Sequence, residues 1–305
     1  MRIGLVDVDG HHFPNLALMR ISAYHKAKGD QVEWWLGDLF HYDIVYKSKV
    51  FSDAFSQDVP DPVNADLVIK GGTGYVINLQ NGIEVYNKAE DKLLPSDVEG
   101  MFPDYSIYPE YPFAVAMTSR GCPRGCSFCH VAAKEGRKSV KVANVSDFYA
   151  GQKEIQVLDP NITACKDKHE LFEQYIETGA RIEFNQGLDI RMITEKDIEY
   201  INRMHIKSVH MAWDNANDDL IDKFKMFAEL YKGSLRSISQ VFVLTNYNST
   251  MEENLYRIYT LRDLGYNPYV TIYNKPQAPK EIRRLQRWVN SKYIFRSVLR
   301  FEDYK

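Results

Sequence analysis

Three of the four cysteines of the chain lie close together, at Cys122, Cys126 and Cys129, in the pattern C-x3-C-x2-C with glycine and proline between the first two. Thiolates are the ligands of iron–sulfur clusters, and closely spaced cysteines on a flexible loop can face one cluster. Three cysteines hold only three irons of a four-iron cluster. The fourth iron is then open to a ligand that is not protein, as a catalytic metal requires.

Zinc is the main alternative metal for this stretch, since His130 directly follows the last cysteine and would be a fourth ligand. Zinc motifs, however, usually combine one short cysteine pair with a distant second pair. Unligated structural cysteines are a further alternative. The three-cysteine spacing favours the cluster over both.

The pattern resembles the signature of the radical S-adenosylmethionine (radical SAM) superfamily, which carries an aromatic residue just before the last cysteine. Phe128 stands at that place. The resemblance implies a [4Fe-4S] cluster that binds S-adenosyl-L-methionine, cleaves it reductively and makes a 5′-deoxyadenosyl radical, which abstracts hydrogen from a substrate. It further implies a reductant such as flavodoxin or ferredoxin, and contact between the Phe128 backbone and adenine.

Only Cys165 lies outside the cluster motif, so the chain has cysteines for one cluster and not for an auxiliary one. Cys165 follows a predicted strand by a few residues and is a candidate catalytic thiol, to return a hydrogen atom or carry a methyl group. The alternative is a buried free cysteine, which is common in proteins. Clustered cysteines also indicate a reducing, cytoplasmic setting rather than a disulfide framework.

From residue 113 on, strand and helix patterns alternate. Alternation of this kind predicts parallel strands joined by right-handed crossovers, and the number of strands fits a partial (β/α)6 barrel over 113–290, followed by a tail at 291–305. The predicted strands are 113–117, 155–159, 181–185, 207–213, 240–245 and 268–273.

Polar residues follow several of these strands, and in such barrels the chemistry lies at the carboxyl ends of the strands. The resemblance implies that Asp159 meets the amino group of the cofactor, in a stretch that departs from the family's Gly-Gly-Glu, and that Asp214 contacts its methionyl or ribose part. Asn161, in the same stretch, is a further candidate for cofactor binding. Arg191 has two interpretations. It pairs with the cofactor carboxylate, or it forms a salt bridge with Asp189.

The pattern of strands and a helix predicts a small Rossmann-like α/β domain over residues 1–76. Residues 77–112 are expected to form a linker that covers part of the barrel. The domain resembles the cobalamin-binding-like domain of one radical SAM branch. The cobalt-binding motif of that branch is D-x-H-x-x-G, whereas Asp9 and His11 stand in D-x-H-x-x-P. Cobalamin, and with it a cobalamin-dependent radical SAM methyltransferase, is therefore an alternative that the missing glycine disfavours.

The 305 residues carry a formal net charge of −3, and no apolar stretch is long enough to span a bilayer. The amino-terminal apolar run is short and reads as a strand, not as a signal peptide. The substrate is not identified by any motif, and a small-molecule or nucleotide-like compound is expected. A basic stretch at 275–287 keeps nucleic acid as a partner, and with it the third hypothesis of a non-catalytic, metal-stabilised nucleic-acid or partner-binding protein.

Overall fold

The computed structural model describes residues 1–80, 83–235 and 239–305. The chain divides into two compact units, Met1–Val115 and Ala116–Lys305. The division falls inside strand β7 (Ala114–Ala116) rather than at residue 76. Residues 77–112, expected to be a linker, therefore belong to the first unit, and the tail at 291–305 belongs to the second.

The first unit contains a parallel sheet of four strands in the order β2-β1-β3-β4. This order is that of the flavodoxin-like type of doubly wound sheet, so the expected small α/β fold is present in its coarse form. Helix α1 (Leu16–Ala27) connects β1 to β2, and its first turn is capped by the Asn15 side chain. The strands are β1 (Arg2–Asp7), β2 (Gln31–Trp34), β3 (Tyr42–Ser48) and β4 (Ala65–Gly71).

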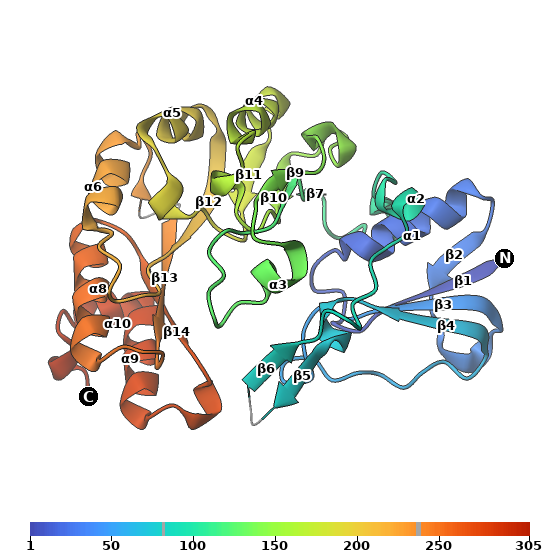
Figure 1. Ribbon diagram of the computed structural model, residues 1–305, viewed down its shortest axis with the longest axis horizontal. Coiled ribbons are helices and arrows are strands. Elements are labelled where there is room, and N and C mark those ends of the chain that lie inside the picture. Colours follow the sequence, from blue (N-terminus) through green and yellow to red (C-terminus); the bar gives the residue numbers. More distant parts are fainter. Residues whose placement is uncertain (81–82, 236–238) are drawn as a thin grey trace. The chain divides into compact units, whose positions relative to one another are not determined.

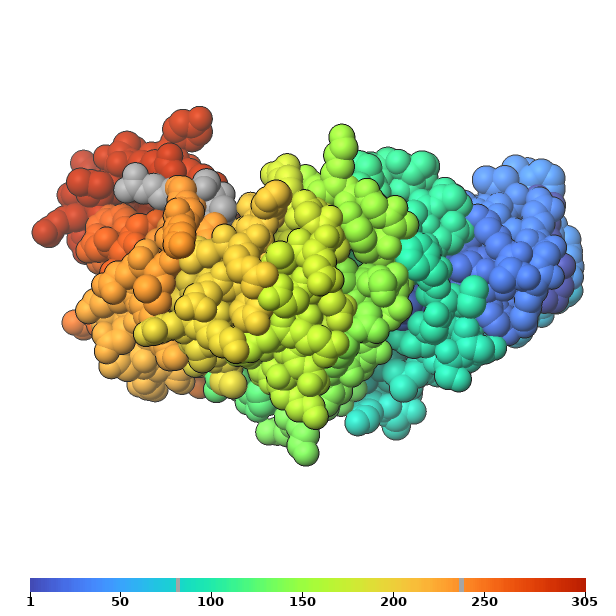
Figure 2. Space-filling model, turned by 90° about the horizontal axis from the view of Figure 1, so that it is seen from above, coloured from blue at the N-terminus to red at the C-terminus, as the bar shows by residue number. Residues whose placement is uncertain are grey.

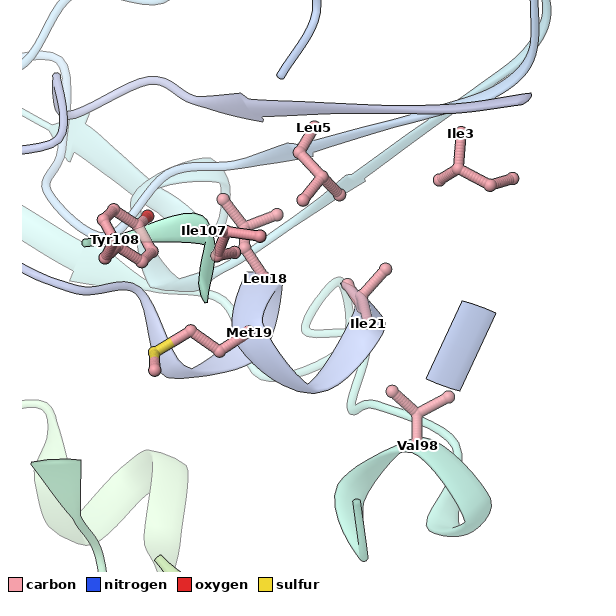
Figure 3. Close-up of a cluster of buried hydrophobic side chains, with 8 residues drawn as sticks. All are labelled: Ile3, Leu5, Leu18, Met19, Ile21, Val98, Ile107 and Tyr108. Atoms are coloured by element: carbon pink, nitrogen blue, oxygen red, sulfur yellow. The ribbon is translucent and has the colours of Figure 1, made fainter. Parts of the chain in front are cut away.

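The core of the first unit includes part of the segment that we expected to be a linker. Figure 3 shows Ile3 and Leu5 of β1 beside the apolar side chains that α1 presents at helical spacing. Val98 of α2 (Ser96–Glu99) and Tyr108 pack into the same cluster and are at most 6% exposed. Burial of each such side chain stabilises the fold by roughly 1.5–3 kcal/mol. Along the chain, an antiparallel hairpin of β5 (Ile77–Gln80) and β6 (Ile83–Tyr86) comes between β4 and α2.

The second unit contains a sheet of six strands in sequential order, β7-β10-β11-β12-β13-β14. The pairings from β10 to β14 are parallel. All six predicted strands are present, which confirms an α/β fold with parallel sheets. Their bounds, after β7, are β10 (Glu154–Val157), β11 (Arg181–Phe184), β12 (His205–Ala212), β13 (Ser239–Thr245) and β14 (Pro268–Ile272).

Helices follow the strands and lie along the outer side of this curved sheet (Figure 1). Thr194 and Asp197 form a capping box at the start of α5, and Thr250 and Glu253 form one at the start of α8. In Figure 2 the side chains of α4, α5 and α6 form a continuous layer of the surface, coloured from yellow-green to orange. The helices are α4 (Lys168–Thr178), α5 (Glu195–Arg203), α6 (Ile221–Leu230) and α8 (Met251–Asp263).

The sheet of the second unit ends at β7 on one side and at β14 on the other. Helix α9 (Lys280–Asn290) lies against β14, and α10 (Lys292–Ser297) follows it. The Asn290 side chain accepts a hydrogen bond from the Val270 N–H at 2.8 Å, and Gln286 donates one to the Val270 carbonyl at 3.0 Å. Side-chain amides thus occupy backbone groups of an edge strand that would otherwise be unpaired. None of the helices built from the described residues has both the length and the apolar content that a membrane span requires.

Candidate functional site

The three-cysteine loop is closed at its base by a short antiparallel ladder of β8 (Ser119–Arg120) and β9 (Val140–Lys141). The Cys122 N–H also donates to the Gly136 carbonyl at 3.0 Å, just after helix α3 (Val131–Glu135). Gly121 has a φ of +93°, and a Cβ there would lie 2.0 Å from the Lys138 carbonyl oxygen. The tight turn before the first cysteine therefore requires glycine.

Asp159, at the end of β10, anchors the start of this loop. Its carboxylate accepts hydrogen bonds from the N–H and the hydroxyl of Thr118, both at 2.8 Å, and from the Ser119 N–H at 2.5 Å. The residue is 2% exposed, and burial raises the pKa of its carboxyl group although the three donors favour the charged form. The Asp159 carboxylate is thus occupied by protein donors, which gives it a positioning role.

Cys122 and Cys126 are half-buried and Cys129 is exposed, so the loop keeps its thiols near the surface. Burial raises the pKa of Cys126, the positive charge of Arg191 lowers it, and the charges of Cys129 and Cys122 raise it. A cluster that neutralises the three thiolates would remove this mutual repulsion. The donor set therefore fits an iron–sulfur cluster.

Within the described ranges, no three His, Cys, Asp or Glu side chains lie close enough together to hold one metal ion. This finding bears on a zinc ion and on an iron–sulfur cluster alike.

Asn161 lies beside the first cysteine. Its side-chain N–H group is 3.4 Å from the Cys122 sulfur and 3.3 Å from an Asp189 carboxylate oxygen. The side-chain oxygen of Asn161 accepts hydrogen bonds from the Thr163 hydroxyl and the Ala164 N–H. These bonds cap the short helix Ile162–Ala164. The amide is therefore fixed in orientation, with its donor directed at the cluster loop.

Asp189 connects the cluster loop to the next strand end. One carboxylate oxygen accepts from Arg124 Nε at 2.7 Å, and the other accepts from Arg191 Nε at 2.6 Å. Burial would raise the pKa of Asp189, but the two guanidinium groups lower it. Arg191 also lies 3.3 Å from Asp218. Of the two interpretations of Arg191, the salt bridge with Asp189 is present, and the guanidinium keeps further N–H donors for an anionic ligand.

Asp214 has fewer hydrogen-bond donors than Asp159. It follows β12 and accepts a hydrogen bond from the Leu244 N–H at 3.2 Å. Burial raises the pKa of its carboxyl group to about 6, although the charges of Arg257 and Arg191 favour the ionised form. A cationic ligand beside Asp214 would stabilise its charged form.

Aromatic side chains from two strand ends surround the middle of the cluster loop. The Phe128 ring lies 5.3 Å from the ring of Tyr247, which follows β13, and Tyr247 lies 4.8 Å from the ring of Tyr273, which follows β14. The Ser127 hydroxyl also hydrogen-bonds to the Tyr247 hydroxyl. The cluster loop thus contacts the far end of the same sheet.

Cys165 lies at the end of the short helix Ile162–Ala164 and is 1% exposed. Burial raises the pKa of its thiol. A protonated, buried thiol is the state expected of a structural cysteine.

The D-x-H turn of the first unit has structural contacts of its own. The His11 ring lies 3.9 Å from the Trp34 ring and 5.8 Å from the Tyr108 ring, and the Tyr111 hydroxyl donates to the His11 carbonyl. Asp9 accepts a hydrogen bond from the Val50 N–H at 2.6 Å. These contacts involve the ring and the backbone carbonyl of His11, and the turn has Pro14 where the cobalt-binding motif has glycine.

Arg257 was missed by sequence reasoning. It is 0% exposed and donates to the carbonyls of Trp213, Asp214 and Leu244, so it joins the ends of β12 and β13. Burial lowers its pKa to about 10. Its position on the same helical face as Ile258 and Leu261 was the available signal, because a charged residue at core spacing must have buried partners.

No family model matches the chain. Part of it is similar to an uncharacterized methyltransferase of Pyrococcus horikoshii, at 27% identity over 168 residues. The aligned region covers 50% of this chain and 35% of that protein, so half of this chain corresponds to about a third of its relative.

Proposed function

We propose that the second unit is a partial radical SAM barrel that holds a [4Fe-4S] cluster on Cys122, Cys126 and Cys129. The observation that carries the proposal is the position of the three thiols, on a loop after the first strand of a sequentially ordered parallel sheet. The polar strand ends of that sheet lie around the same loop. When bound, the cluster would supply one electron that cleaves S-adenosyl-L-methionine and starts hydrogen abstraction from the substrate.

The residues of the site have distinct roles in this proposal. Asp159 and Gly121 hold the cluster loop in position, and Asn161 donates to a ligand sulfur. Arg191 pairs with the cofactor carboxylate through its remaining donors. Asp214 faces the cationic or ribose part of the cofactor, where a positive charge would lower its raised pKa.

A methyl-transfer reaction is the second candidate, and the printed name of the Pyrococcus horikoshii relative favours it. The missing glycine of the D-x-H-x-x-P turn disfavours a cobalamin-dependent form of that reaction. The reductive cleavage needs an electron donor, for which we propose a flavodoxin or ferredoxin.

The test begins with anaerobic reconstitution of the full chain with iron and sulfide, and then measures 5′-deoxyadenosine after reduction with S-adenosyl-L-methionine. Cys126→Ala should lose cluster absorbance and product, whereas the matched variant Cys165→Ala should keep both. Methyl-labelled S-adenosyl-L-methionine and an assay for S-adenosylhomocysteine distinguish methyl transfer. Stoichiometric zinc, with no cluster absorbance and no product, would overturn the proposal.

A further inference from the structure

Helix α9 has one apolar face and one strongly basic face. Ile282, Leu285, Trp288 and Val289 are buried. Lys280, Arg283 and Arg287 recur at three- and four-residue spacing on the opposite side, and Glu281 is the one acidic residue of the helix. Together with Lys275 and Gln286 they line an open depression of about 350 Å³. We call Lys275, Lys280, Arg283 and Arg287 the basic stripe.

The charges of the basic stripe are not neutralised within the part of the chain that the structure describes, where no ion pair joins any of the four to a carboxylate. Arg283 instead donates to the carbonyls of Lys275 and Pro276, at 3.0 and 2.9 Å. Basic residues of other helices are paired, for example Arg203 with Glu173 at 2.7 Å. Since the whole chain has a net charge of −3, the stripe is a local feature and not the result of a basic composition.

The basic stripe begins at the carboxyl end of β14, on the same side of the sheet as the cluster loop. The short helix Lys275–Gln277 follows β14 after Tyr273 and Asn274. The Tyr273 ring contacts the Tyr247 ring, and Tyr247 contacts Phe128 of the cluster loop. A series of aromatic rings thus leads from the start of the stripe to the loop.

We propose that the basic stripe and the Tyr247–Tyr273 pair bind single-stranded nucleic acid, with backbone phosphates on the stripe and a base against the tyrosines. A basic groove beside aromatic side chains is the combination by which proteins bind single strands. The stripe from Lys280 to Arg287 spans about 10 Å of helix, which is longer than one phosphate group needs and suits a run of phosphates. The binding of nucleic acid does not depend on the proposed function. Only the further consequence, that the bound base is the substrate, rests on the proposed function.

The test measures binding of a fluorescent single-stranded RNA of about 12 nucleotides to the reconstituted full chain, at several salt concentrations. The double variant Lys280→Glu/Arg287→Glu should bind at least about tenfold more weakly, with a salt slope lower by about 1.4, or about 0.7 for each lost phosphate contact. Tyr273→Leu should weaken binding about fivefold or more, since a stacked base contributes roughly 1–3 kcal/mol.

The matched control is Lys196→Glu/Lys232→Glu, which makes the same change of charge at two exposed lysines away from the stripe. The affinity of this control for RNA should stay within about twofold of that of the unchanged protein, because salt screens the long-range effect of two distant charges. Equal weakening in the control and in the stripe variant, no weakening in the stripe variant, or equal competition by polyglutamate would overturn the proposal.

Production of 5′-deoxyadenosine in the absence of RNA separates this inference from the proposed function. Full production with no RNA binding would overturn the inference and leave the proposed function in place. RNA binding that depends on the basic stripe, without production of 5′-deoxyadenosine, would overturn the proposed function and leave this inference in place.

Discussion

The two parallel sheets differ in how the charges at their carboxyl edges are satisfied. In the first unit the Lys47 side chain, at the end of β3, is 0% exposed and lies 2.7 Å from Asp61 and 3.1 Å from Asp58. Lys49 is paired with Asp53. In the second unit Asp214 accepts a backbone hydrogen bond but has a raised pKa.

The difference shows that a parallel-sheet edge is not a ligand site by topology alone. Lys47 at the first edge has two carboxylates as counter-charges, whereas the second edge keeps three thiols and a carboxylate of raised pKa, Asp214. Groups whose charge the protein does not satisfy are those that an external ligand can stabilise. The comparison predicts that changes at the first edge act on stability, and changes at the second act on ligand binding.

The largest expected effect is in the first unit. Asp58→Ala/Asp61→Ala leaves Lys47 buried without a counter-charge, which should destabilise the unit by about 3–5 kcal/mol. Amide hydrogen exchange of peptides from 42–71 measures the change. Adding Lys47→Met to the double variant removes the buried charge and should restore most of the protection. If the triple variant is as unprotected as the double one, the ion pairs are not the cause.

The next effect concerns the anchor of the cluster loop. Asp159→Ala leaves the three donors of Thr118 and Ser119 without their acceptor, which should cost about 2–4 kcal/mol and lower the iron retained after reconstitution. Iron content and hydrogen exchange over 114–122 measure the two consequences. Thr118→Val, which removes one of the three donors, should show about a third of the effect. An unchanged iron content in Asp159→Ala would contradict the positioning role.

Asp214 at one edge and the pair Asp58 and Asp61 at the other should respond to pH in opposite directions. The pKa of Asp214 is raised from 3.8 to about 6, so the folded state holds the proton more tightly, and stability falls as pH rises through that window, by at most about 3 kcal/mol. For Asp61 the hydrogen bonds from Lys47 and Lys70 lower the pKa, and for Asp58 the bonds from Tyr75 and Lys47 outweigh burial. Asp58 and Asp61 therefore contribute to the stability of the folded state above pH 3.8, and this contribution is lost as the pH falls through their lowered pKa values.

Urea unfolding of the full chain between pH 3 and pH 8 measures this contrast. Asp214→Asn should remove the fall between pH 3.8 and 6 and leave the acid loss, and Asp61→Asn should weaken the acid loss alone. If Asp214→Asn leaves the profile unchanged, its carboxyl group is not held in the protonated form.

The smallest expected effect is that of Cys165. Cys165→Ala should cost about 1 kcal/mol, from the small cavity left by the thiol, and should leave the yield of 5′-deoxyadenosine per cluster unchanged. A tenfold loss of yield at full cluster content would restore Cys165 as a catalytic residue.

The strands were predictable because short apolar runs alternated with amphipathic helices over the whole second unit. The strand-end rule also identified Asp159, Asn161, Arg191 and Asp214 as polar residues of one edge. Their individual partners were not predictable, because the hydrogen bond between Thr118 and Asp159 joins residues 41 positions apart.

The segment 77–112 was harder to interpret, because its prolines and polar residues are typical of a linker. A few apolar residues at irregular spacing, Val98, Ile107 and Tyr108, nevertheless complete the core of the first unit. Periodicity reveals residues on a regular element, and these residues come from short turns and helices that have no period to detect.

The amide groups that α9 places against β14 have a consequence for protein made at high concentration. An exposed edge strand is a template on which a second chain can add its own strand and begin to aggregate. At Val270 the backbone N–H and carbonyl are already bound by Asn290 and Gln286, so an incoming strand would have to displace both. Protein at high concentration should therefore resist β-sheet aggregation at this edge.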